Sequence, residues 1–92
     1  MTRYAARVDR NQPEIVAQLR GVPGVTVFPT HCTGNGFPDI VVGYRGASFL
    51  YEIKMPGEKL TEKEVKFHEG WMGHVMIAYC VEDILIDLGL AD

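Results

Sequence analysis

Several features that mark well-known protein classes are absent from this sequence. No apolar run approaches the ~20 residues that a membrane span needs, and no basic and then apolar segment opens the chain, so we expect neither a membrane span nor a signal peptide. The only two cysteines, Cys32 and Cys80, lack the spacing of a CxxC pair. We therefore expect no disulfide framework, and a reducing, intracellular location in the cytoplasm.

An excess of basic charge is also lacking. The 92 residues carry nine Lys or Arg and twelve Asp or Glu, for a formal net charge of -3, whereas proteins that bind a nucleic-acid backbone are usually basic. The charge is unevenly distributed, because residues 1–60 hold seven bases and five acids and residues 61–92 hold two bases and seven acids. The first part is net +2 and the second net -5, so the total charge alone does not exclude a nucleic-acid partner.

Apolar segments separated by Gly and Pro predict seven secondary-structure elements in the order helix, strand, strand, strand, helix, strand, helix. We expect helices over about 11–21, from Thr61 to near Gly73 and from 82 onward, and strands over 25–28, 40–44, 48–54 and 75–80. The segment 40–44 is apolar throughout, which is typical of a strand covered on both faces. With no repeat or linker, residues 1–92 should form one α/β domain.

Two short motifs define local structure most clearly. Thr61 followed three residues later by Glu64 fits a capping box, in which the threonine hydroxyl accepts from the glutamate amide and the carboxylate reaches back. Arg45-Gly46 lies between two apolar segments and predicts a hairpin turn. The strands over 40–44 and 48–54 should therefore be antiparallel neighbours.

This hairpin would bring three polar residues together. Asp39 begins one strand, and Glu52 and Lys54 end the next, so all three should lie at one edge of the sheet. Two carboxylates, with the backbone carbonyl of Ile53 as a further oxygen, suit Mg²⁺, which takes few protein carboxylates plus water and phosphate. Lys54 adds a cation that can orient or help deprotonate an attacking water, and it can also offset charge on a phosphate. Such a set is suited to phosphodiester hydrolysis.

Pro38-Asp39 with Glu52-Ile53-Lys54, in an αβββαβ order, resembles the PD-(D/E)XK nuclease superfamily, and more closely its VRR-NUC (virus-type replication-repair nuclease) domain. Further family-like positions are Asn11, Glu14, Gly36-Phe37 and Leu60-Thr61. The resemblance implies a restriction-endonuclease-like αβββαβ core, with a mixed central sheet flanked by helices. It also implies that Asp39, Glu52 and Glu14 ligate Mg²⁺ or Mn²⁺ and that Lys54 is catalytic.

Stand-alone, phage-type members of this branch are homodimers that cut branched DNA such as Holliday junctions, so the resemblance implies those partners here. Glu64 stands where the family often has glutamine, which leaves its role in substrate positioning open. Other residues could contact DNA or could simply be solvated: Arg3, Arg7, Arg10, Asn35, Lys59, Lys63 and Lys66.

Each position also has a plain structural interpretation. Alone, Asp39 can be a turn residue, Glu52 and Lys54 a solvated strand face, and Glu14 an acid placed favourably in the first turn of a helix. Taken jointly, they predict a metal-dependent, structure-specific DNA endonuclease. The alternatives are a catalytically inactive nucleic-acid-binding module of the same fold, and a nuclease of the superfamily that acts on unbranched DNA or RNA.

Overall fold

Seven elements follow one another in the predicted order. The computed structural model describes residues 9–92. The elements are α1 (Gln12–Arg20), β1 (Val25–Pro29), β2 (Ile40–Tyr44), β3 (Ala47–Ile53), α2 (Glu62–Gly70), β4 (Val75–Ala78) and α3 (Val81–Asp87). Together they form an α/β fold with a mixed four-stranded sheet flanked by three helices, so the predicted fold class is confirmed.

The sheet has the strand order β1-β2-β3-β4. β1 and β2 are antiparallel, as are β2 and β3, whereas β3 and β4 are parallel and joined through α2. The predicted hairpin is confirmed: Arg45 and Gly46 have φ values of 53° and 79° between β2 and β3, as a tight two-residue turn of this kind requires. The hairpin register pairs Ile40 with Tyr51 and thereby fixes which side chains share a face.

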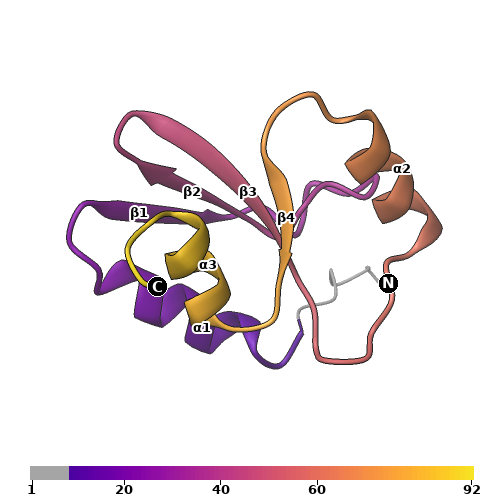
Figure 1. The fold of residues 1–92 in the computed structure, drawn as a ribbon. Helices are drawn as coiled ribbons and strands as arrows, with labels where there is room; N and C mark the ends of the chain where they lie inside the picture. The colour runs from indigo at the N-terminus through magenta and orange to yellow at the C-terminus, as the bar shows by residue number, and fades with distance from the viewer. Residues whose placement is uncertain (1–8) are drawn as a thin grey trace.

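The hydrophobic core lies between one face of the sheet and the two helices α1 and α3, which lie side by side in Figure 1. α1 contributes Ile15, Val16 and Leu19, whose spacing places them on one side of the helix. The other core residues are Val25, Ile40, Val42, Tyr51, Ile53, Ala78, Val81, Ile84 and Leu88. In β2 and β3 the residues of this core lie two apart along the strand, as expected of a sheet that is buried mainly on one face.

The expectation that β2 is covered on both faces was wrong. Ile40 and Val42 are buried, but Val41 on the opposite face is only half-buried. On that face Phe28 is 69% exposed beside a hollow of about 320 Å³. Val41 and Gly43 line this partly open surface, and both are half-buried.

α2 stands apart from α1 and α3 in Figure 1 and has no buried residue. Its predicted capping box is confirmed: the Thr61 hydroxyl accepts from the Glu64 amide at 3.2 Å, and the Glu64 carboxylate accepts from the Thr61 amide at 2.8 Å. The helix is held to the loop before β2 by Phe37, whose ring packs edge-on against Phe67 at 5.2 Å. The loop that carries Asp39 and the helix that carries Glu64 are thus packed together.

Two predicted boundaries differ from the structure by more than one residue. α2 ends at Gly70 with Trp71 as its C-cap, because the Trp71 backbone becomes extended there. β4 ends at Ala78, where its pairing with Ile53 stops, and Cys80 is already the N-cap of α3.

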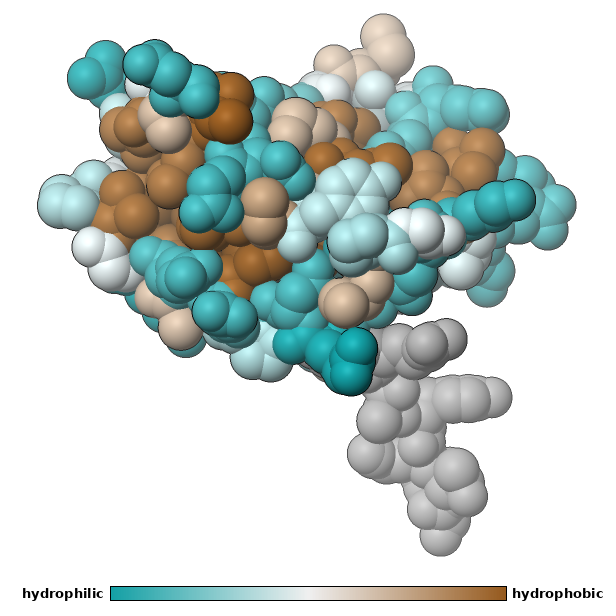
Figure 2. All heavy atoms as spheres, turned by 60° about the horizontal axis from the view of Figure 1, so that its bottom comes forward, coloured by the Kyte–Doolittle hydropathy of each residue, from teal (hydrophilic) through white to brown (hydrophobic). Residues whose placement is uncertain are grey.

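Among the helices described, none has the length and apolar character to cross a membrane. Figure 2 shows hydrophobic side chains on one face as patches between hydrophilic ones.

Candidate functional site

Five of the predicted residues line one pocket of about 170 Å³ at the open end of the β2–β3 hairpin, opposite its turn: Asp39, Glu52, Lys54, Lys59 and Glu64. Asp39 immediately precedes β2, and Glu52 and Lys54 lie at the end of β3. The full lining is Asp9, Asp39, Glu52, Lys54, Glu58, Lys59, Thr61 and Glu64. The predicted convergence of Asp39, Glu52 and Lys54 therefore agrees with the structure.

Asp39 is held by both its backbone and its side chain. Its amide donates to the Tyr51 carbonyl at 3.0 Å, which extends the hairpin ladder by one residue beyond Ile40. Its Oδ2 atom accepts from the Ile53 amide at 2.8 Å. Because Ile53 lies between Glu52 and Lys54, this bond fixes the Asp39 carboxylate beside the backbone of both residues.

Glu52 is a buried acid with an unused oxygen. Its side chain is 2% exposed, and its Oε1 atom has no hydrogen-bond partner within residues 9–92. Burial, then the hydrogen bond and charge of Asp39, then those of Glu64, raise the pKa of Glu52 to about 10. At neutral pH this carboxyl group therefore keeps its proton unless a cation replaces it.

Lys54 faces the same pocket as an ammonium ion. Its Nζ atom lies 2.9 Å from Oε1 of Glu64, the same oxygen that accepts from the Thr61 amide. Burial lowers the pKa of Lys54, but the hydrogen bond and charge of Glu64 outweigh burial, so that the net pKa is raised. For Glu64 burial raises the pKa, and the bonds from Lys54 and Thr61 more than reverse it. The pair is thus ionic at neutral pH.

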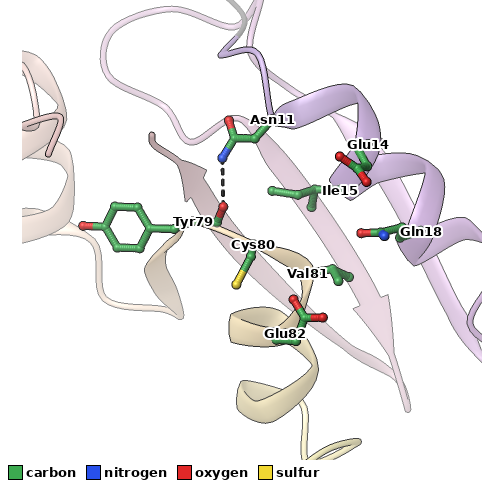
Figure 3. Close-up of a pocket in the computed structure, with 8 residues that line it drawn as sticks. All are labelled: Asn11, Glu14, Ile15, Gln18, Tyr79, Cys80, Val81 and Glu82. Atoms are coloured by element: carbon green, nitrogen blue, oxygen red, sulfur yellow. Dashed lines mark hydrogen bonds between the residues drawn. The ribbon is translucent and has the colours of Figure 1, made fainter. Parts of the chain in front are cut away.

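Glu14 does not join this cluster. It is exposed on α1 and lines a different pocket, of about 290 Å³, which Figure 3 shows between α1 and the start of α3. The N-terminal end of α1 is fixed at the end of β3, since the Asn11 side chain donates to the Lys54 carbonyl. Residues before the helix therefore reach the Asp39 pocket, and Glu14 does not. The expectation that Glu14 contributes to a shared metal site is not supported by this geometry.

Two acids that sequence reasoning missed, Asp9 and Glu58, line the pocket that Glu14 does not reach. Glu58 accepts from the Met55 amide at 2.7 Å, in the turn that follows β3. Asp9 precedes α1, and burial, followed by the charge of Glu58, raises the pKa of Asp9. The Pro56-Gly57 turn was a usable signal for Glu58, because a tight turn returns the next residue to the strand end. No local signal marks Asp9.

The predicted DNA contacts fall into three groups. Lys59 lines the pocket, and Lys63 and Lys66 are exposed on α2. Arg10 and Asn35 are exposed outside the pocket lining, the latter with a φ of 57°. Arg3 and Arg7 lie outside the described residues. All of these contacts stay predictions.

The donor atoms fit a hydrated cation better than a cage built by protein alone. Within residues 9–92, no group of three or more His, Cys, Asp or Glu side chains is arranged to hold a metal ion. Mg²⁺, however, usually takes only one or two protein carboxylates and completes its shell with water and phosphate. Asp39 and the Oε1 atom of Glu52 can supply two carboxylate ligands. That the Ile53 carbonyl oxygen is a further ligand stays a prediction.

Known proteins offer no further guide to the site. The resemblance of Pro38-Asp39 and Glu52-Ile53-Lys54 to the VRR-NUC domain therefore stays a prediction, and the functional argument depends on the geometry of the pocket. In comparisons with protein-family models, curated proteins and solved structures, nothing matches this chain.

Proposed function

We propose that this chain is a nuclease that hydrolyses phosphodiester bonds in DNA with Mg²⁺ or Mn²⁺. One observation carries the proposal: the buried carboxyl group of Glu52, with an oxygen that has no partner in the described part of the chain, lies in one pocket with Asp39 and the ammonium group of Lys54. Two neighbouring acids are seldom buried together in a protein, because the burial of like charges is unfavourable. An arrangement of this kind is typical of a site that takes up a cation.

Each residue has a role that follows from its contacts. Asp39 and Glu52 would hold the cation, which when bound would lower the pKa of a water molecule and offset charge on the phosphate. The Lys54 ammonium would stabilise charge that develops on the phosphate oxygens in the transition state. Lys54 does not act as the base, because its bond to Glu64 keeps it protonated.

Glu64 then has a positioning role. It caps α2 through the Thr61 amide and holds the Lys54 ammonium with the same oxygen. The glutamine that the family often has at this position could cap the helix but could not neutralise Lys54. In this proposal, Glu64 fixes the direction of the Lys54 side chain, and it does not contact the substrate.

Branched DNA, such as a Holliday junction, is the substrate that the motif resemblance favours. Each chain contributes one Asp39–Glu52–Lys54 pocket, and one such pocket cuts one strand. Symmetric cleavage of a junction would therefore need a two-fold homodimer that presents two pockets to the same DNA. Sedimentation of the free protein and of its junction complex measures this state directly.

The test compares wild type with Lys54→Ala on end-labelled junction, flap, linear duplex, single-stranded DNA and RNA, in Mg²⁺, Mn²⁺ or EDTA. We expect cleavage only with a divalent cation, and a loss of at least about 10²-fold in Lys54→Ala, as for other electrostatic catalytic groups. Arg20→Ala, which removes an exposed cation that lies on α1 and lines a different pocket, is the charge-matched control and should cut like wild type.

The outcomes separate the alternatives. Cleavage in EDTA, or full activity of Lys54→Ala with a native circular dichroism spectrum, would contradict the proposal. Binding of DNA with no cleavage by wild type would favour an inactive binding module of the same fold. If wild type cuts RNA or linear duplex as fast as the junction, the proposed hydrolysis stands, but branched DNA is not the preferred substrate.

A further inference from the structure

The Asn11 side chain joins the start of α1 to the ends of two strands. Its Nδ2 atom donates to the Lys54 carbonyl at 3.0 Å and to the Tyr79 carbonyl at 2.9 Å. Figure 3 shows the bond to Tyr79, across the gap between α1 and the segment that follows β4. Both acceptors are carbonyl oxygens, so only the amide nitrogen of Asn11 can face them.

These bonds lie at the point where β3 and β4 stop pairing. The last paired residues are Ile53 and Ala78, and the Lys54 amide donates to the Ala78 carbonyl at 3.1 Å. Asn11 then supplies a donor to the carbonyls of Lys54 and Tyr79, one residue further along each strand. Both backbone polar groups of Lys54 are therefore bonded, one to β4 and one to α1.

Helix capping does not explain why this residue is asparagine. Asn11 is the N-cap of α1, yet its side chain makes no capping hydrogen bond and its backbone is helical. Serine, threonine and aspartate serve as well as asparagine at an N-cap, but none of them has two N–H donors on one nitrogen. The residue type matches the two strand carbonyls instead.

We propose that Asn11 is a positioning residue for Lys54: it fixes the main chain of the lysine and so aims the ammonium group into the pocket. This inference rests on the proposed function where it concerns cleavage. Asn11 itself lines the neighbouring pocket and not the one that holds Asp39 and Glu52. Its loss should therefore lower kcat for DNA cleavage about 10- to 100-fold, as a displacement near 1 Å does, with KM changed less than about threefold.

The experiment compares Asn11→Ala with Gln18→Ala, which removes an exposed amide from the same pocket of α1 (Figure 3). The first readout is the ¹⁵N–¹H correlation of the Lys54 ammonium group, assigned by its absence in Lys54→Arg. Wild type and Gln18→Ala should give the cross-peak of a lysine held by Glu64, and Asn11→Ala should broaden or shift it. The second readout is kcat and KM, corrected for the folded fraction.

Asn11→Gln keeps both donors on a chain one methylene longer, and should give a cross-peak and a kcat between those of wild type and Asn11→Ala. This variant also serves if Asn11→Ala does not fold. The proposal is overturned if Asn11→Ala retains the wild-type cross-peak and kcat, if Gln18→Ala changes them equally, or if wild type lacks the cross-peak. If wild type cuts no DNA, the proposed function fails, whereas the ammonium signal still decides the part played by Asn11.

Discussion

Replacement of Glu52 by glutamine should stabilise this protein at neutral and alkaline pH. The folded chain holds Glu52 at 2% exposure beside the carboxyl groups of Asp39 and Glu64, and these surroundings raise its pKa from 4.5 to about 10. Between those two values the folded chain binds one proton that the unfolded chain has lost. Glutamine has nearly the same shape and cannot ionise, so it removes this dependence on pH.

The sign and size follow from the proton count. Because unfolding releases a proton in this range, the free energy of unfolding falls by about 1.4 kcal/mol for each pH unit of increase. The stabilising contribution of the Glu52 proton is complete below the unfolded pKa and is lost as the pH rises through the folded pKa. Between pH 5 and pH 8 the loss is at most about 4 kcal/mol. Since neighbouring groups relax, we expect Glu52→Gln to exceed wild type by about 2 kcal/mol at pH 8.

Urea unfolding followed by circular dichroism in EDTA, at pH 5, 6, 7 and 8, measures this difference. Glu69→Gln, which removes an exposed carboxyl group from α2, is the matched control and should follow wild type at every pH. A Glu52→Gln variant that is less stable than wild type at pH 8, or a difference that does not grow with pH, would refute the reasoning.

The same variant tests whether a cation replaces the proton. A ligand present at 100 times its Kd stabilises the folded state by about 2.7 kcal/mol, so Mn²⁺ or Mg²⁺ at such a level should stabilise wild type. Glu52→Gln should gain far less, because an amide oxygen is a weaker ligand than a carboxylate for these ions. Equal stabilisation of both proteins would place the cation elsewhere.

Two further predictions concern the scaffold of the site. Tyr51→Phe removes a buried hydroxyl that donates to Asp87 Oδ2 at 2.7 Å, and should lower the free energy of unfolding by about 1 kcal/mol; an unchanged urea midpoint would contradict that bond. Gly36→Ala places a Cβ atom 2.3 Å from the Lys63 carbonyl oxygen at a φ of 78°, and should cost at least about 2 kcal/mol and alter tryptophan fluorescence. Gly34→Ala is the control, because its Cβ atom at a φ of 84° would meet nothing within 4 Å and would add backbone strain without a clash. An equal loss of unfolding free energy in Gly34→Ala would show that the contact of Gly36 with α2 is unimportant.

Local signals were sufficient where a few adjacent residues decide the structure. The capping box of Thr61 and Glu64 involves bonds over three residues, and the Arg45-Gly46 turn requires two adjacent positive φ values. Asp39 and Glu52 could be placed together for the same reason, because a two-residue turn fixes the register of the hairpin. The centre of the candidate site therefore followed from the sequence.

The rim of the site did not follow, because it depends on contacts between distant segments. The periodicity of α1 shows that Ile15 and Leu19 face the core, but it does not show where the helix begins relative to β3. That position depends on the bonds from Asn11 to two carbonyls 43 and 68 residues away. With α1 fixed there, Asp9 lines the pocket and Glu14 does not.

The same reasoning explains why a net charge of -3 says little about partners. The carboxyl groups of the pocket come from five separate segments, at Asp9, Asp39, Glu52, Glu58 and Glu64. The Glu52 proton and the side chains of Lys54 and Lys59 offset this charge, and Lys54 is already bonded to Glu64. A divalent cation that displaced the Glu52 proton would leave Lys54 and Glu64 in place. We therefore expect the pocket to contribute least to the free energy of unfolding at high pH without a divalent cation. The proposed reaction should also stop when the cation is removed.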